Sequence, residues 1–142
     1  MNPTEEIWVV DDDRSIRWVL EKSFRHSGFE VNCFENAERL LKALERRTPD
    51  LIVTDIRMPG MDGLTLLSQI RVKHPDLPVI VITAHSDLDS AISSYEGGAF
   101  EYLPKPFDID EAVSLARRAC EQSRQHRQQG QVAASTEQFP EI

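Results

Sequence analysis

The stretch that decides the fold is IWVVDDDRSI, at residues 7–16. Its apolar, β-prone start is typical of a strand that is buried on both faces, and three aspartates follow at once. Apolar residues then return at helical spacing, at Ile16, Val19 and Leu20, until Gly28 provides a stop signal. The stretch therefore predicts a β–α unit whose strand ends on carboxylates.

The same alternation recurs along the rest of the chain. We expect further strands at 29–34, 51–54, 78–82 and 99–103, and helices at 16–24, 37–44, 64–70, 88–95 and 109–120. β–α units in series predict an α/β fold with a doubly wound parallel sheet, helices on both faces and right-handed crossovers. In such folds the functional crevice lies beyond the carboxyl ends of the strands.

The composition narrows the function classes. The 142 residues include 16 Lys and Arg against 24 Asp and Glu, a net charge of −8. This acidic balance argues against direct binding of a nucleic-acid backbone. No apolar run approaches the roughly 20 residues that span a bilayer, so we expect no membrane association. Cys33 and Cys120 are too few for a disulfide framework, which favours a reducing, cytoplasmic location.

The composition changes towards the C-terminus. Residues 125–142 are rich in Gln, Ser and Ala and have no sustained apolar period. They predict a flexible linker that follows a folded domain at residues 1–124 and leads toward a further domain.

Polar residues stand at the ends of four predicted strands. Asp11 and Asp12 follow the first strand and Asp55 the third, while Thr83 ends the fourth and Lys105 the fifth. The carboxyl ends of parallel strands meet at one edge, so these side chains should converge. Like charges repel, and a Mg²⁺ ion would relieve the repulsion among the carboxylates. A carboxylate beside Mg²⁺ and a lysine is equipped to accept a phosphoryl group.

Each of these residues also has a purely structural interpretation. The aspartates of the first turn could cap the following helix, a role that we assign to Asp13. Asp55 could be a turn residue, Thr83 a helix cap and Lys105 a solvated loop lysine. Their joint placement at strand ends favours a site.

Four short motifs resemble the signature of response-regulator receiver domains, over about residues 5–124. They are VVDDDRSIR at 9–17, VTDIRMPGMDG at 53–63, VITAH at 81–85 and YLPKPF at 102–107. Longer stretches, such as DIRMPGMDGLTLL at 55–67, are similar to the receivers of σ54-dependent activators of nitrogen-regulated transcription. The resemblance implies a flavodoxin-like (βα)5 fold with strand order 2-1-3-4-5.

The resemblance also implies a role for each site residue. Asp55 matches the phosphoacceptor, and Lys105 matches the lysine that pairs with the phosphoryl oxygens. Asp12 matches the direct Mg²⁺ ligand and Asp11 its neighbour, which acts through water. The backbone carbonyl of Arg57 matches the remaining protein ligand, and the peptide bond after Lys105 is expected to be cis.

A switching mechanism follows from the same resemblance. Thr83 matches the hydroxyl that turns toward the phosphoryl group, and Tyr102 the aromatic residue that follows it. The predicted helix 88–95 contains several weak helix formers and should shift at low cost. We expect the shift to expose a partner surface that includes Leu88, Ala91 or Tyr95.

The implied function is signalling rather than turnover. A sensor histidine kinase would phosphorylate Asp55, and the phosphoryl group would be lost slowly by self-hydrolysis. The σ54-activating ATPase and DNA-binding domains would lie outside this chain, and phosphorylation could produce a homodimer. Two alternatives remain: a Mg²⁺-dependent phosphohydrolase with an aspartyl nucleophile, or a phosphorylation-independent pseudo-receiver. Haloacid-dehalogenase-like phosphatases need an acid two positions after the nucleophile, where this chain has Arg57.

Overall fold

The computed structural model describes residues 4–84 and 98–137, with side chains through residue 125. Its elements in chain order are β1 (Glu6–Val10), α1 (Arg14–His26), β2 (Glu30–Phe34), α2 (Ala37–Leu44), β3 (Leu51–Asp55), α3 (Gly63–Lys73), β4 (Val79–Ala84), β5 (Glu101–Lys105) and α5 (Ile109–Glu137). The predicted helix 88–95, with Leu88, Ala91 and Tyr95, lies outside the described residues.

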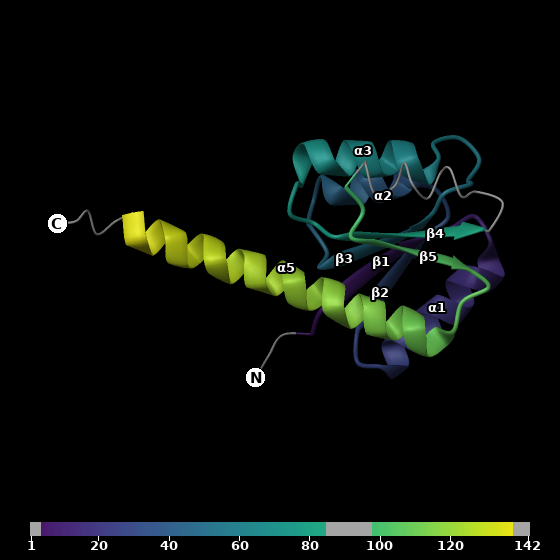
Figure 1. The fold of residues 1–142 in the computed structure, drawn as a ribbon. Helices are drawn as coiled ribbons and strands as arrows, with labels where there is room; N and C mark the ends of the chain where they lie inside the picture. Colours follow the sequence, from purple (N-terminus) through teal and green to yellow (C-terminus); the bar gives the residue numbers. More distant parts are fainter. Residues whose placement is uncertain (1–3, 85–97, 138–142) are drawn as a thin grey trace.

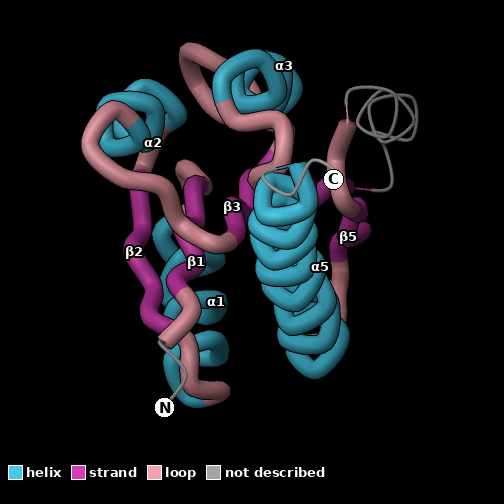
Figure 2. Tube along the Cα trace, turned by 90° about the vertical axis from the view of Figure 1, so that its left-hand side faces the viewer, coloured by secondary structure: helices cyan, strands magenta, loops and turns pink. Residues whose placement is uncertain are grey.

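The strands form one parallel sheet in the order β2-β1-β3-β4-β5. This order and the α/β class confirm the expectation from the sequence. Helices α2 and α3 cover one face of the sheet, and α1 and α5 cover the other (Figures 1 and 2). The two helical layers leave the carboxyl edge of the central strands open for a site.

Alternating residues of β1 build the two halves of the core. Ile7 and Val9 belong to the apolar cluster that includes residues of α1 and α5, whereas Trp8 and Val10 belong to the cluster with α2 and α3. All four side chains are at most 1% exposed. A central parallel strand buried on both faces explains why this segment reads as a continuous apolar run.

The outer strands differ from the central ones. β5 is an edge strand, and its residues are mostly half-buried. It contains Pro104, which has no N–H to donate to a ladder and is tolerated in a strand only where the missing donor faces away from a neighbour. The edge position of β5 therefore accommodates the Pro-Lys-Pro sequence that carries Lys105.

The capping residues explain where two of the helices begin. Asp13 is the N-cap of α1, and its carboxylate accepts hydrogen bonds from the backbone N–H groups of Ser15 and Ile16. This confirms its predicted role as a cap. Asp62 caps α3 in the same way, through the N–H of Thr65. Both helices thus start directly behind the carboxyl edge of the sheet.

Helix α5 is longer than the sequence predicts. It continues to Glu137 and runs out beyond the sheet (Figure 1), past residue 124, where the linker was expected to begin. Gln, Ala, Glu and Arg dominate this stretch and are good helix formers, even without an apolar period. The prediction relied on that period and so placed the end of the helix too early, while the domain boundary at residue 124 stays a prediction.

No helix within residues 4–84 or 98–137 is both long and apolar enough to span a membrane.

Candidate functional site

The register of the sheet brings the predicted site residues to one edge. Asp55 is the last residue of β3 and pairs with Ile82 of β4, so that Thr83 lies one residue farther along. Lys105 is the last residue of β5 and pairs with Ala84. Asp11 follows directly after β1, the neighbour of β3 on its other side.

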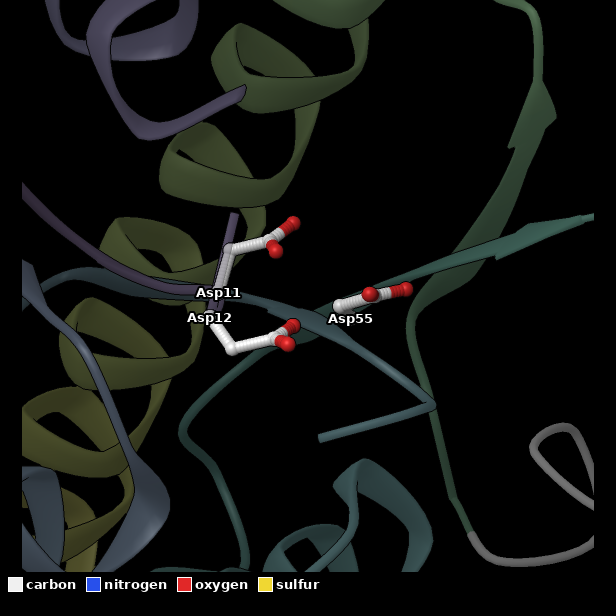
Figure 3. Close-up of side chains that lie close together, drawn as sticks. All are labelled: Asp11, Asp12 and Asp55. Carbon is white, nitrogen blue, oxygen red and sulfur yellow. The ribbon is translucent and has the colours of Figure 1, made fainter. Parts of the chain in front are cut away.

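Three carboxylates form a cluster at this edge. Each of Asp11, Asp12 and Asp55 offers an oxygen, and these oxygens lie within 4.8 Å of one another. The side chains of Asp11 and Asp12 extend from the end of β1 toward Asp55 (Figure 3). Asp11 and Asp55 are buried, whereas Asp12 is exposed. The cluster is therefore open to solvent on the side of Asp12.

Burial strongly affects the carboxyl group of Asp11. Its Oδ1 accepts a hydrogen bond of 2.8 Å from the backbone N–H of Asp13. Its Oδ2 is buried and has no hydrogen-bond partner among the described residues. Desolvation raises the pKa of Asp11 from 3.8 to about 6, against the opposing effect of the hydrogen bond from Asp13. The nearby charge of Asp55 raises the pKa further.

Asp55 lies between a backbone donor and a lysine. Its Oδ1 accepts a hydrogen bond of 2.9 Å from the N–H of Ile56, and its Oδ2 lies 3.6 Å from Nζ of Lys105. Burial raises the pKa of Asp55, while the charge of Lys105 opposes the rise. The lysine thus favours the ionised form of the carboxyl, which is the nucleophilic form.

The cluster has the chemistry of a divalent-cation site. Hard carboxylate oxygens are the donors that Mg²⁺ prefers, and the unpartnered Oδ2 of Asp11 is an acceptor that needs a cation or donor. Asp12 lines a cavity of about 600 Å³ beside the cluster, and most of its other lining residues, Arg57 among them, belong to the β3–α3 loop. The residues present therefore fit the expected metal.

The two predicted switch residues lie on neighbouring strands. Thr83 of β4 is 2% exposed, and its hydroxyl donates to the backbone carbonyl of Ala84 at 3.2 Å. Tyr102 of β5 is half-buried and packs against the apolar cluster beneath α2 and α3. The peptide bond between Lys105 and Pro106 is cis, as expected.

Gly63 and Arg17 also contact the backbone of the site, and the sequence analysis did not identify either residue. Gly63 begins α3, and a Cβ at this position would lie 2.1 Å from the backbone oxygen of Asp55. Only glycine allows this approach, which also lets the N–H of Gly63 donate to the carbonyl of Ile56 at 2.8 Å. Arg17 of α1 donates from Nη1 to the carbonyl of Asp11 at 2.5 Å. The glycine directly after the capping residue Asp62 is a sequence signal that could have indicated the close contact between Gly63 and Asp55.

The family model described as "Response regulator receiver domain" matches residues 7–117. The chain belongs to this family. Among curated proteins, this receiver domain is 63% identical over 113 residues to the DNA-binding transcriptional regulator NtrC of Escherichia coli K12. That match covers 80% of this chain and 24% of NtrC, so the receiver domain spans about a quarter of the relative's length. In sequence, the receiver domain of this chain is thus similar to the receiver domain of NtrC.

Solved structures agree with this assignment. The solution structure of the apo receiver domain of NtrC has a TM-score of 0.76 and 61% identity, covering 82% of this chain and 94% of that one. A crystal structure of NtrX from Brucella abortus, in complex with ADP, has a TM-score of 0.86 and 34% identity. It covers 92% of this chain and 30% of NtrX. The receiver domain of NtrC thus resembles this chain both in fold and in sequence.

Proposed function

We propose that Asp55 accepts a phosphoryl group from a sensor histidine kinase in a reaction that needs Mg²⁺. The carrying observation is the position of Asp55, with Lys105 at 3.6 Å on one side and the carboxylates of Asp11 and Asp12 on the other. Membership of the receiver family supports the same role. The carboxylate of Asp55 thus lies between the ammonium group of Lys105 and two further carboxylates that are suited to bind a divalent cation.

The residues divide the chemistry between them. An ionised oxygen of Asp55 attacks phosphorus, and the bond from phosphorus to the donor's imidazole nitrogen breaks as its electron pair returns to the ring. Lys105 pairs with the phosphoryl oxygens after transfer. Asp12 would bind Mg²⁺ directly and Asp11 through water, with Asp55 and the backbone carbonyl of Arg57 as the other ligands. When bound, Mg²⁺ neutralises charge on the transferring phosphoryl group.

The signal then leaves the site through the adjacent strands. Thr83 would turn toward the phosphoryl group, and Tyr102 would follow on β5. The residues 88–95 would shift in response and present Leu88, Ala91 or Tyr95 to a partner. The burial of Thr83 supports this transmission, because the side chain of a buried residue cannot change its rotamer unless the neighbouring side chains repack.

The output is the control of an NtrC-like activator of σ54-dependent transcription in nitrogen regulation, in the cytoplasm. The σ54-activating ATPase and the DNA-binding domain would belong to the rest of the regulator, joined through the linker that begins near residue 125. Identity to NtrC at 63% supports this assignment. Phosphorylation could bring two receivers together as a homodimer.

Two other functions make different predictions. A phosphohydrolase would turn over many phosphate esters, but the position two residues after Asp55 is Arg57, which cannot act as a general acid. A pseudo-receiver would bind partners without accepting a phosphoryl group. The presence of all the acids and of Lys105 favours the phosphoacceptor over both. Slow self-hydrolysis is then the only hydrolytic activity that we expect.

The decisive test is the intact mass of the chain after incubation with acetyl phosphate and Mg²⁺. We expect one phosphoryl adduct in the wild type and none in Asp55→Asn or without metal. The matched control is Asp50→Asn, a carboxylate at the opposite edge of the sheet, which should be phosphorylated normally. An adduct that survives in Asp55→Asn would contradict the proposal. Release of many phosphate equivalents per chain would favour the phosphohydrolase.

The switch has its own test. Relaxation-dispersion measurements on amides 84–98 should show exchange that phosphorylation of Asp55 changes, and Thr83→Ala should weaken that response. Identical dispersion before and after phosphorylation would contradict the switching part of the proposal and leave the phosphoacceptor role intact.

A further inference from the structure

We propose that Arg71 forms a second site, at the opposite edge of the sheet from Asp55, that binds the carboxylate of a small organic acid. Arg71 lies in the last turn of α3, and its side chain runs toward the amino ends of β4 and β5. The inference does not depend on phosphorylation, because it concerns the other end of the strands.

The unpartnered atoms of Arg71 are the first step in the argument. Its Nη1 donates to the backbone carbonyl of Pro75 at 2.7 Å. Its Nε and Nη2 are buried and have no hydrogen-bond partner among the described residues. These two atoms form one edge of the planar guanidinium, the edge that binds a carboxylate through two parallel hydrogen bonds. Buried donors of this kind normally have a partner, so an acceptor is expected here.

The surroundings provide room for a ligand. Arg71 lines a cavity of about 320 Å³ between the α3–β4 loop, the start of β5 and helix α5. Gln122 and Ser123 of α5 line the same cavity and offer further polar groups. This volume lies at the lower end of the range for small-molecule sites. The cavity is thus large enough for a small acid.

Gly98 fixes the guanidinium in this place. It has a positive φ of 96°, and a Cβ there would lie only 2.8 Å from Cδ of Arg71. The stem of Arg71 therefore packs directly against a glycine backbone, which restricts its rotamers. A donor edge that is held in advance loses less entropy when it binds a ligand.

The negative charges near the cavity favour a singly charged anion over a doubly charged one. Asp76 lines the cavity beside Arg71, and the chain carries a net charge of −8. Both disfavour a doubly charged phosphate more than a singly charged carboxylate. Burial lowers the pKa of Arg71, and the charge of Asp76 opposes this effect. Because the guanidinium is partly desolvated, a bound anion would also stabilise its positive charge. A monocarboxylate satisfies the two donors with the least added repulsion.

The test is a titration of the 142-residue chain with sodium acetate at constant ionic strength, followed by ¹⁵N NMR. We expect the side-chain Nε–H signal of Arg71 and the amides of Gly98 and Ser123 to shift and to saturate. In Arg71→Lys, which keeps the charge and loses the planar edge, the affinity should fall at least roughly tenfold. The matched control Arg46→Gln, an exposed arginine elsewhere, should bind as the wild type does.

Two results would overturn the proposal. One is a shift that stays linear in acetate or is equal in wild type and Arg71→Lys, which would indicate a general salt effect. The other is tighter binding of inorganic phosphate than of acetate, because the charge argument would then be wrong. If Arg71→Lys does not fold, the wild type decides alone: the Nε–H of Arg71 must saturate while that of Arg46 does not. Either failure would leave the role of Asp55 untouched.

Discussion

Nζ of Lys105 lies 3.6 Å from Oδ2 of Asp55, although β4 separates the two strands that carry them. The lysine reaches across β4 from the edge strand to the buried carboxyl. Its side chain is 31% exposed and that of Asp55 is 11% exposed. The pair therefore couples the outer strand of the sheet to the carboxylate cluster at the end of its central strands.

Lys105→Ala should slow phosphorylation of Asp55. Without the ammonium group, burial raises the pKa of Asp55 further, because only the hydrogen bond from Ile56 still opposes it, and the phosphoryl oxygens lose a cationic partner. We expect adduct formation from acetyl phosphate to be roughly 10- to 100-fold slower. The defect should grow as the pH falls, because less of the carboxyl is ionised. Intact mass against time, measured across pH, checks this; equal rates in Lys105→Ala and the exposed control Lys73→Ala would contradict it.

Asp11→Asn should stabilise the metal-free protein at neutral pH. The pKa of Asp11 is about 6 in the fold against 3.8 for the free side chain, so the folded state binds the proton more tightly. Wild-type stability should therefore fall as the pH rises from about 4 to about 6. Asparagine removes this cost, and we expect a gain on the order of 3 kcal/mol at pH 7 that disappears below about pH 4.

Urea unfolding of Asp11→Asn across this pH range, with and without Mg²⁺, measures the effect. Added Mg²⁺ should stabilise the wild type more than the variant, because the variant has lost a carboxylate of the cluster. Asp13→Asn is the matched control, since it removes a neighbouring charge and keeps a good N-cap residue. A variant less stable than the wild type at pH 7 without metal would show that burial of this carboxylate is not costly.

Gly63→Ala should damage both stability and the site. The added Cβ would lie 2.1 Å from the backbone oxygen of Asp55, so the start of α3 or the end of β3 must move. We expect a loss of about 3 kcal/mol in the free energy of unfolding and weaker Mg²⁺ binding. In the control Gly28→Ala the new Cβ meets nothing within 4 Å, and only its positive φ costs about 1 kcal/mol. Equal losses in the two variants would argue against the close contact.

Glu6→Gln tests a buried carboxylate at the amino end of the sheet. Glu6 accepts hydrogen bonds from Nε1 of Trp8 at 2.8 Å and from Nδ2 of Asn32 at 2.6 Å, and it forms an ion pair of 2.8 Å with Arg47. The amide keeps the shape of the side chain and loses the charge. We expect a loss of about 1–3 kcal/mol in urea unfolding and a shifted indole N–H signal of Trp8. Glu30→Gln, exposed on the next strand, should change neither.

The strands and the carboxylate cluster could be predicted because their signals are local. The apolar run before Asp11 marks a buried strand, and the rule that parallel strands end at one edge then brings Asp55 and Lys105 together. The cap at Asp13 was equally readable, since it depends on residues within one turn. In each case, residues that are close together in the sequence are enough to predict the structural element.

The contacts that escaped prediction join distant parts of the chain. Glu6 and Arg47 are 41 positions apart, and nothing near either residue indicates the pair. The buried edge of Arg71 depends on Gly98 and on helix α5, which come together only in the folded chain. The end of α5 was misplaced for a different reason: helix propensity without apolar periodicity gives a weak signal.

Pro104 has a consequence for the assembly of the sheet. It lies in edge strand β5, so its missing N–H leaves a gap in the outward row of donors, and Pro106 adds a second gap just beyond the strand. An exposed strand edge without such gaps is a template for pairing with another chain, and proline is one of the means by which proteins block it. The Pro-Lys-Pro sequence therefore protects the protein from edge-to-edge aggregation at the same place where it delivers a lysine to the buried carboxyl.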